Sequence, residues 1–269
     1  MYKISGQKGF TLVELLVVIS IIALLMAILI PVLSRVRKQA KAVGCTANLR
    51  HWGLMLTMYA QENHDSLPIG WNGGTMWMVD LLPYYQGEGD ICLCPTAKKF
   101  LHEIPGNTPG TFTAWGKYGE PGYFNGWIPP WGYKGQYGSF GVNGWVHNPL
   151  DRGAPGTYDI SIVSRTRFWR TINIRGASEV PAFGDCMWDG TEPLQNDAPP
   201  IAEGRQLEGS GMSAFCLNRH TGNMNMTFLD TSVRKVGLKQ LWKLKWHKEY
   251  DTSASSPQWP DWMRNFKDR

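Results

Sequence analysis

The sequence predicts an α+β protein in which one long amino-terminal helix is followed by a head built on an antiparallel β-sheet. Three observations predict this fold. An apolar run from Leu15 to Leu33 contains no charged residue. Apolar residues then recur at spacings of three or four up to about Glu62, which is typical of a continuing amphipathic helix. Beyond the helix, short runs with strand-like alternation are separated by glycine and proline, which favours short strands joined by loops.

The apolar run is long enough to cross a membrane. At about 1.5 Å per residue, residues 10–33 match a hydrocarbon core roughly 30 Å thick, which takes about 20 residues. Glu14 lies near the start of this run. A charge inside a membrane helix costs about 2.5–3.5 kcal/mol, so such a residue usually has a partner and a purpose. Pro31 removes a backbone donor near the end of the run, and we expect a helix kink there.

The residues around Glu14 form a specific motif. Gly9-Phe10-Thr11-Leu12-Val13-Glu14-Leu15-Leu16 resembles the processing site of the type IV pilins and of the pseudopilins of type II secretion. The resemblance implies that prepilin peptidase cleaves between Gly9 and Phe10 and methylates the new terminus at Phe10. It also implies that Glu14 acts in assembly, where its carboxylate meets the terminal amine of a neighbouring subunit and the two charges neutralise each other.

The same resemblance implies a domain organisation and a location. Residues 1–9 would be the leader peptide, residues 10–62 the transmembrane and assembly helix, and residues 63–269 the globular pilin-like head. The chain would cross the inner membrane once with its head outside the cytoplasm, and then join a periplasmic or extracellular filament. The implied partners are other subunits of a helical homo- or hetero-polymer, prepilin peptidase, the inner-membrane assembly platform, and membrane lipid before assembly.

Two other interpretations of the amino terminus are weaker. A secretory signal peptide has a shorter apolar core and an A-x-A-like cleavage site, and residues 30–34 offer no such site. A simple membrane anchor is the other alternative, because Arg35, Arg37, Lys38 and Lys41 follow the span and the positive-inside rule alone would place them in the cytoplasm. The processing motif is the more detailed signal and favours the pilin orientation.

The second half of the helix is expected to pack against the head through a stripe of apolar residues. The residues at helical spacing are Val32, Val36, Ala40, Val43, Ala47, Leu54 and Met58.

Charge is distributed unevenly along the chain. Residues 1–62 carry seven Lys or Arg and two acids, whereas residues 63–269 carry twenty of each, so the net charge of +5 lies entirely in the leader and helix. A nucleic-acid-binding head would show a clustered basic footprint, and we therefore expect no nucleic-acid partner.

A second resemblance lies near the carboxyl end. His220 and Asp230 are separated by nine residues and resemble the H-x9-D-G signature of one large group of pilin-like proteins, with Thr231 in place of glycine. Alternation from Met224 predicts a strand that turns at Asp230 into a second strand at residues 233–236. We expect a structural contact between His220 and Asp230. Because no nucleophile or metal-protease motif accompanies the pair, the sequence predicts no enzyme activity.

Five cysteines suggest cross-links after export. An oxidising compartment predicts one or two disulfides among Cys92, Cys94, Cys186 and Cys216. A bond between Cys92 and Cys94 is geometrically awkward, so each is expected to pair with Cys186 or Cys216. Cys45 either joins this set or stays buried as a small apolar residue.

No cofactor is expected, although two metals are worth weighing. Zinc on Cys92-x-Cys94 lacks the second half of a typical site. Calcium is a candidate because some pseudopilins in the resembling family use it to hold a carboxyl-terminal loop. The sequence offers oxygen ligands, but without EF-hand spacing, at Asp185, Asp189, Glu192 and Asp197.

The head contains most of the chain's thirteen tryptophans, and they raise a different functional class. Indole rings stack on sugars, so the alternative function is a membrane-anchored, non-polymerising carbohydrate-binding module. Packing in the core or at subunit interfaces is the simpler role for them. The residues in loop-like sequence that would test the alternative are Trp71, Trp77, Trp115, Trp127 and Trp131.

Overall fold

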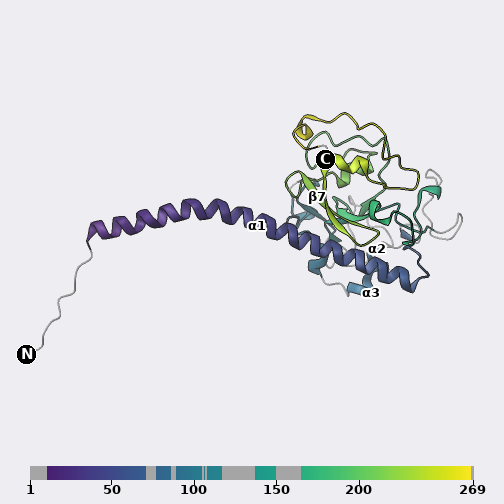
Figure 1. Ribbon diagram of the computed structural model, residues 1–269, viewed down its shortest axis with the longest axis horizontal. Helices are drawn as coiled ribbons and strands as arrows, with labels where there is room; N and C mark the ends of the chain where they lie inside the picture. The colour runs from purple at the N-terminus through teal and green to yellow at the C-terminus, as the bar shows by residue number, and fades with distance from the viewer. Residues whose placement is uncertain are drawn as a thin grey trace, which may run out of the picture. The chain divides into compact units, whose positions relative to one another are not determined.

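A computed structural model of the chain describes residues 11–70, 77–85, 89–104, 106, 108–116, 137–149 and 165–267. Contacts divide the chain into two compact units, Met1–Ala40 and Lys41–Arg269, and helix α1 (Leu12–Glu62) contributes to both (Figure 1). This long helix and the mixed, mainly antiparallel sheet of the second unit confirm the predicted α+β class. The helix ends at Glu62, as its periodicity predicts.

The described residues of the first unit are Thr11 and the first part of α1, up to Ala40. Every residue from Thr11 to Ala40 is exposed, and the segment is apolar and long enough, by length and composition, to cross a membrane. From Leu12 to Leu33 it extends about 33 Å at the usual helical rise. Pro31 lies inside the helix. Because proline has no N–H, the carbonyl of Ala27 lacks its usual helical donor there.

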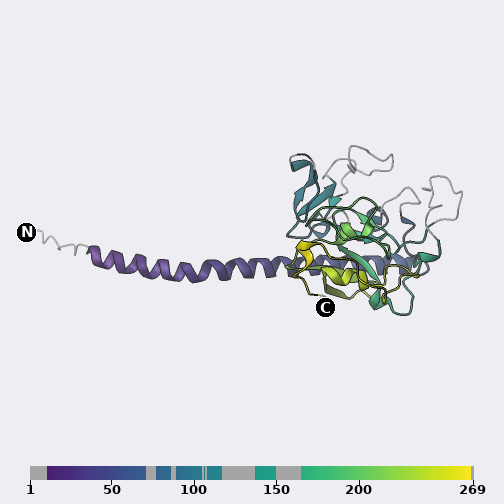
Figure 2. The same cartoon turned by 90° about the horizontal axis from the view of Figure 1, so that it is seen from above.

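The second unit contains the rest of α1, which packs on a sheet. Residues of the buried face recur at spacings of three or four, namely Ala42, Cys45, Leu49, Trp52, Met55, Leu56 and Ala60. In Figures 1 and 2 this part of the helix runs beside strand β7 (Asn223–Phe228), and the Thr227 hydroxyl donates to the Leu49 carbonyl at 2.7 Å. Gly53 allows the close approach, since a Cβ there would lie 2.5 Å from Thr227 Cγ2.

The predicted packing face of the helix is wrong. Val43, Leu54 and Met58 are 69%, 45% and 48% exposed, and Ala47 is exposed too. This part of α1 is apolar on more than one side, so spacing alone does not say which side meets the sheet. The sheet is met by the side that carries Leu49 and Trp52, with its small glycine at Gly53.

The main sheet has five strands in the order β6-β4-β5-β7-β8. Three neighbouring pairs are antiparallel, and β4 pairs with β6 in parallel. The strands are β4 (Phe140–Asn143), β5 (Pro181–Asp185), β6 (Gly190–Thr191), β7 (Asn223–Phe228) and β8 (Val233–Gly237). A smaller sheet joins β1 (Lys99–Phe100), β2 (Thr113–Gly116) and β3 (Tyr137–Gly138), with β1 and β2 parallel and β2 and β3 antiparallel.

The predicted hairpin near the carboxyl end is confirmed. Strands β7 and β8 pair in register from Asn223 opposite Gly237 to Thr227 opposite Val233. Thr231 takes the place of glycine in the turn and still adopts a left-handed conformation with φ of 65°. Its N–H donates to the Phe228 carbonyl at 2.9 Å, so the tight turn forms without glycine.

Short helical segments connect the strands in the described part of the head. The α-helices are α2 (Trp77–Asp80), α3 (Leu82–Tyr85) and α4 (Gly211–Phe215). The 3-10 helices are η2 (Gly89–Cys92), η3 (Leu101–Glu103), η6 (Arg165–Arg167), η7 (Ala177–Glu179), η8 (Leu238–Lys243) and η9 (Asp261–Met263).

Aromatic rings form the core between α1 and the main sheet. The ring of Trp52 lies edge-on to Trp77 with 4.8 Å between centroids, and Trp77 lies 5.0 Å from Phe183 on β5. This cluster ties the second half of α1 to the head.

Candidate functional site

The first turn of α1 is closed by a reciprocal capping box. The Thr11 N–H donates to Glu14 Oε2 at 2.8 Å, and the Glu14 N–H donates to Thr11 Oγ1 at 3.3 Å. The Thr11 hydroxyl also donates to Glu14 Oε2 at 2.7 Å. Threonine at the N-cap and glutamate three residues later are the signature of this cap. In a single chain Glu14 therefore stabilises the start of its own helix.

Glu14 carries an unbalanced charge in the part of the chain that the structure describes. It is the one charged residue between Leu12 and Leu33, it is exposed, and no described cation pairs with it. Gly9 and Phe10 lie outside the described residues, so their cleavage and methylation stay predictions. The assembly role of Glu14 and the kink at Pro31 stay predictions too.

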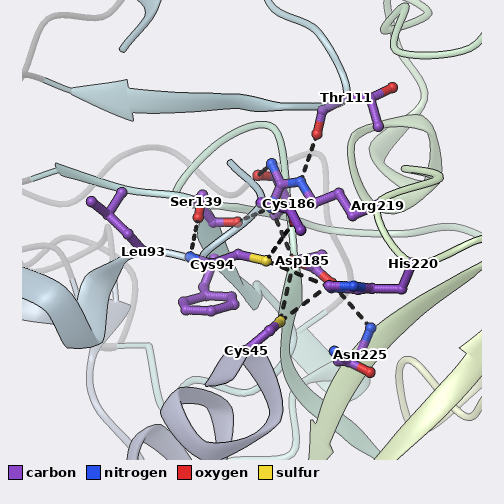
Figure 3. A network of polar contacts seen from close by, with 12 residues as sticks. Cys45, Leu93, Cys94, Thr111, Ser139, Asp185, Cys186, Arg219, His220 and Asn225 are labelled. Atoms are coloured by element: carbon purple, nitrogen blue, oxygen red, sulfur yellow. Dashed lines mark hydrogen bonds and ion pairs between the residues drawn. The ribbon is translucent and has the colours of Figure 1, made fainter. Parts of the chain in front are cut away.

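A second group of polar side chains meets inside the head (Figure 3). Cys45 comes from α1, Cys94 from the loop after η2, Asp185 from the end of β5, and His220 from the loop before β7. All four are buried, and one sulfur, nitrogen or oxygen atom of each lies within 4.8 Å of the others. We call these four residues the buried cluster.

Distances within the buried cluster are those of close polar contact. His220 Nε2 lies 3.2 Å from Asp185 Oδ2 and 3.5 Å from Cys94 Sγ. The Cys45 thiol lies 3.7 and 3.8 Å from the two oxygens of Asp185. The Asn225 N–H also donates to Asp185 Oδ2 at 3.0 Å. Asp185 is therefore the centre of the group.

Arg219 lies beside the buried cluster and holds it through an ion pair with Asp185. Its Nη1 donates to Asp185 Oδ1 at 3.1 Å and also to the Ser139 carbonyl, and both charged side chains of this ion pair are fully buried. The remaining N–H groups donate to the carbonyls of Thr111 (2.7 Å), Thr113 (3.1 Å) and Cys186 (3.0 Å). All five guanidinium hydrogens are thus used. Because Thr113 belongs to the small sheet and Asp185 to the main one, Arg219 ties the two sheets together.

The charged groups of the buried cluster shift one another's pKa values in the directions that keep both Asp185 and His220 charged. Burial alone would raise the pKa of Asp185, but the His220 hydrogen bond and the Arg219 charge lower it to about 2. Burial alone would lower the pKa of His220, but its bonds to Asp185 and Cys94 raise it to about 9. The pKa of the Cys94 thiol is lowered despite its burial by contacts with Cys45, His220 and Arg219. In the absence of other ligands the cluster therefore favours imidazolium beside carboxylate.

The expected contact between His220 and Asp230 is wrong. The carboxylate beside His220 is that of Asp185. Asp230 is exposed, and its Oδ1 accepts from the N–H and hydroxyl of Ser232 at 3.0 and 2.6 Å. Asp230 thus closes the hairpin turn locally, whereas His220 lies at the other end of β7 and faces the interior.

The expected disulfides do not form in the structure. All five cysteines are free and buried. Cys94 contacts Cys45 and His220, while burial raises the pKa of Cys92 and Cys186 to about 12. Cys45 accordingly does not sit among apolar groups alone, but beside a carboxylate.

The acids weighed for calcium are not gathered into one site among the described residues, where the buried cluster is the one group of three or more such ligands. Asp197 Oδ2 instead accepts backbone N–H groups from Leu194 and Met212 at 3.0 and 2.8 Å. Asp185 belongs to the buried cluster, apart from the other three acids.

Most tryptophans in the described residues are buried in the core, and Trp188, Trp259 and Trp262 are partly buried and pack against it. Trp77 and Trp115 are 2% and 3% exposed, and their indole N–H groups donate to the carbonyls of Asp189 and Phe140. The other loop tryptophans, Trp71, Trp127 and Trp131, lie outside the described residues.

Sequence reasoning found some of these residues for other reasons. His220 was singled out by its spacing to Asp230, and Asp185 by its acidity. Arg219 was missed as an anchor, although its position next to His220 on the approach to a buried strand is a weak signal for a buried pair. No local pattern connects residues 45, 94, 185 and 220.

Comparisons with known proteins concern the amino-terminal part of the chain. Residues 4–30 match the family model of the prokaryotic N-terminal methylation motif. The motif and the exposed apolar helix make the amino-terminal part of the chain similar to type IV pilin-like proteins, and the helix is apolar and long enough to cross a membrane. Over a matched stretch of 60 residues, the chain is 49% identical to the type IV wide pilus major component PilA4 of Thermus thermophilus. This stretch is 22% of this chain and 46% of that protein. The chain thus spans somewhat less than half the length of this curated relative. No solved structure matches the chain.

Proposed function

We propose that the chain is a structural subunit that is processed by prepilin peptidase and polymerises into a filament of the type IV pilus or type II secretion pseudopilus kind. Cleavage between Gly9 and Phe10 would leave a methylated amine at Phe10. The observation that carries the proposal is the amino-terminal motif: residues 4–30 match the methylation motif, and Glu14 stands alone in an exposed apolar helix.

The exposed apolar side chains need a cover. Between Leu12 and Leu33 the large hydrophobic residues are about half exposed or more. Burying one such side chain fully is worth about 1.5–3 kcal/mol, so this surface is unstable in water. Membrane lipid covers it before assembly, and the same helices of neighbouring subunits cover it afterwards. When a subunit moves from the membrane into a bundle of such helices, its apolar side chains are therefore never exposed to water.

A second uncovered apolar surface lies on the head unit. The exposed stripe, which consists of Val43, Ala47, Leu54 and Met58, follows one side of α1 where the other side is packed on the sheet. A stripe of this kind supports packing against another copy, because contiguous exposed apolar surface marks interaction sites. Contact between different faces of successive subunits produces an open helical assembly rather than a closed ring.

The location and partners follow from the same proposal. The subunit would wait in the inner membrane with its head outside the cytoplasm, contact the assembly platform there, and enter a periplasmic or extracellular filament. Its role would be structural rather than enzymatic. The alternative of a carbohydrate-binding module has little support in the described residues, because Trp77 and Trp115 are buried.

The capping box makes a sharp test of the role of Glu14. Glu14→Gln keeps the side-chain acceptor that caps the helix but removes the charge, since glutamine also occupies this position of a capping box. Thr11→Ala removes the cap hydroxyl and keeps the charge. Filaments in shear fractions would be examined by electron microscopy in a host with a prepilin peptidase, with membrane levels of each variant matched by immunoblot.

We expect filaments from the wild type and from Thr11→Ala, and none from Glu14→Gln. Mass spectrometry should find the mature chain starting at a methylated Phe10 in all three, because processing precedes assembly. Filaments of normal length from Glu14→Gln would show that charge neutralisation does not drive docking. Retention of residues 1–9 by the wild type would reject the proposed function itself.

A further inference from the structure

The buried cluster gathers four groups that commonly bind metals into one buried place, and their hydrogen bonds alone do not explain this gathering. Four segments bring two thiols, one imidazole and one carboxylate together, and all four side chains are buried. These are the ligand types that zinc takes in closed, four-coordinate structural sites. Calcium and magnesium prefer all-oxygen ligands, so the two sulfurs favour a softer metal.

Distances between the donor atoms agree with a tetrahedron around zinc. Bonds of about 2.3 Å to sulfur and about 2.0–2.1 Å to nitrogen and oxygen place ligand atoms about 3.5 Å apart for sulfur with nitrogen or oxygen, and about 3.3 Å apart for nitrogen with oxygen. Cys94 Sγ and His220 Nε2 are 3.5 Å apart. Asp185 Oδ2 lies 3.2 Å from His220 Nε2 and 3.8 Å from Cys45 Sγ. These three of the six separations are close to those of a bound tetrahedron, and all six lie within 4.8 Å.

The surroundings balance the charge that a metal would bring. Two thiolates and one carboxylate carry three negative charges, and a zinc ion with the Arg219 guanidinium carries three positive ones. Arg219 binds Asp185 through Oδ1, which leaves Oδ2 for the metal. Zinc takes deprotonated ligands, so its binding would release to solvent whatever protons the two sulfurs and the imidazole carry.

Supporting hydrogen bonds hold the ligands from outside, as they do around known metal sites. The Cys94 N–H donates to Ser139 Oγ at 2.6 Å, and the Thr96 hydroxyl lies 3.0 Å from Cys94 Sγ. The Asn225 N–H holds Asp185 at 3.0 Å.

We propose that Cys45, Cys94, Asp185 and His220 form a structural zinc site that fastens the second half of α1 to the head. The four donors close the coordination sphere, so the metal has no open position for a substrate. Its effect is mechanical: Cys45 on α1 is bonded through one ion to a loop, to β5 and to the approach to β7. This inference is independent of polymerisation, because all four residues lie within the unit Lys41–Arg269.

The test uses the full chain, purified from membranes in detergent without chelator or reductant. The number of zinc ions per chain would be measured by inductively coupled plasma mass spectrometry in the wild type and in the variants Cys94→Ser and His220→Gln. Cys92→Ser is the matched control, since Cys92 is buried two residues from Cys94 and stands outside the cluster. We expect about one zinc per chain in the wild type and the control, and nearly none in the two ligand variants.

Cobalt gives a readout that does not depend on the folding of a variant. After the wild type is stripped with a chelator and loaded with Co²⁺, tetrahedral thiolate ligation should produce intense visible bands and a thiolate charge-transfer band in the near ultraviolet. Zinc should bleach these bands and should raise the melting temperature of the stripped protein by several degrees.

Three results would overturn the inference. The first is wild-type protein that holds no zinc above background and shows no tetrahedral cobalt spectrum. The second is equal loss of zinc from Cys92→Ser. The third is a disulfide between Cys45 and Cys94, seen as a cross-linked peptide and as three rather than five alkylated thiols in denaturant. Five alkylated thiols together with one bound zinc support it.

Discussion

Replacing Arg219 by methionine is the most direct test of how the head is held together. Arg219 is fully buried and donates to one carboxylate and four backbone carbonyls. Methionine fills similar space but donates nothing. Asp185 would then keep its charge in the interior without its guanidinium partner, and the carbonyls that join the two sheets would lose their donors.

The magnitude follows from the buried ion pair. Removing one partner of such a pair costs about 3–5 kcal/mol when the other charge is left uncompensated. The lower end of this range applies here, because His220 still lies 3.2 Å from the Asp185 carboxylate. Each buried acceptor left without a donor adds about 1–3 kcal/mol where water cannot reach it. A domain is stable by about 5–15 kcal/mol in total. Arg219→Met should therefore lower the free energy of unfolding by at least about 3 kcal/mol, which is a large share of the whole.

Urea unfolding of the full chain in detergent, followed by tryptophan fluorescence, would measure this loss. Arg205→Met is the control, since Arg205 is exposed and its replacement should change stability by no more than about 0.5 kcal/mol. Arg219→Lys should fall between wild type and Arg219→Met, because lysine keeps the charge and loses the planar fork. A loss under about 1 kcal/mol for Arg219→Met, or wild-type stability for Arg219→Lys, would refute the reasoning.

Two further predictions concern single residues of the head. Thr231→Gly should stabilise the head by about 1 kcal/mol in the same urea assay, because Thr231 has φ of 65° and a β-branched residue is strained there. Ser232→Gly is the control: it removes a hydrogen bond to Asp230 and should not stabilise the head. Equal effects of the two substitutions would contradict the explanation. Burial lowers the pKa of His147 to about 4 from 6.5, so the unfolded chain binds the extra proton first as pH falls. The stability that neutral, buried His147 contributes is therefore fully present above pH 6.5 and is lost as pH falls toward 4, by about 3 kcal/mol in all. His147→Asn, whose amide can still donate to the Gly144 carbonyl, should make the free energy of unfolding depend less steeply on pH in this range. An unchanged pH dependence would count against the explanation.

Several features of this protein were readable from local sequence because their causes are local. The length of the apolar run and the alternation that leads into the hairpin after Asn223 each depend on residues near in the chain. The helix end at Glu62 and strands β7 and β8 were therefore predicted, and the structure confirms them. The capping pair Thr11 and Glu14 is equally local, although it was not predicted as a cap.

Other expectations failed where distance along the chain decides the contact. The apolar stripe through Val43 and Leu54 has a helical period as good as that of Leu49 and Trp52, and only the sheet shows which side is covered. His220 lies ten residues from Asp230, yet β7 carries the two to opposite ends of a strand. Proximity in sequence was a poor guide to the partner of a buried histidine.

The amino-acid sequence by itself determined an apolar helix with one carboxylate near its start, a motif that resembles a processing site, and a head whose acidic and basic residues are equal in number. The tertiary structure alone decided that Cys45, Cys94, Asp185 and His220 share one dry space behind Arg219. The physical reason is that a membrane helix and its cap are set by neighbours one turn away, whereas a buried charge is tolerated only where distant segments converge to compensate it.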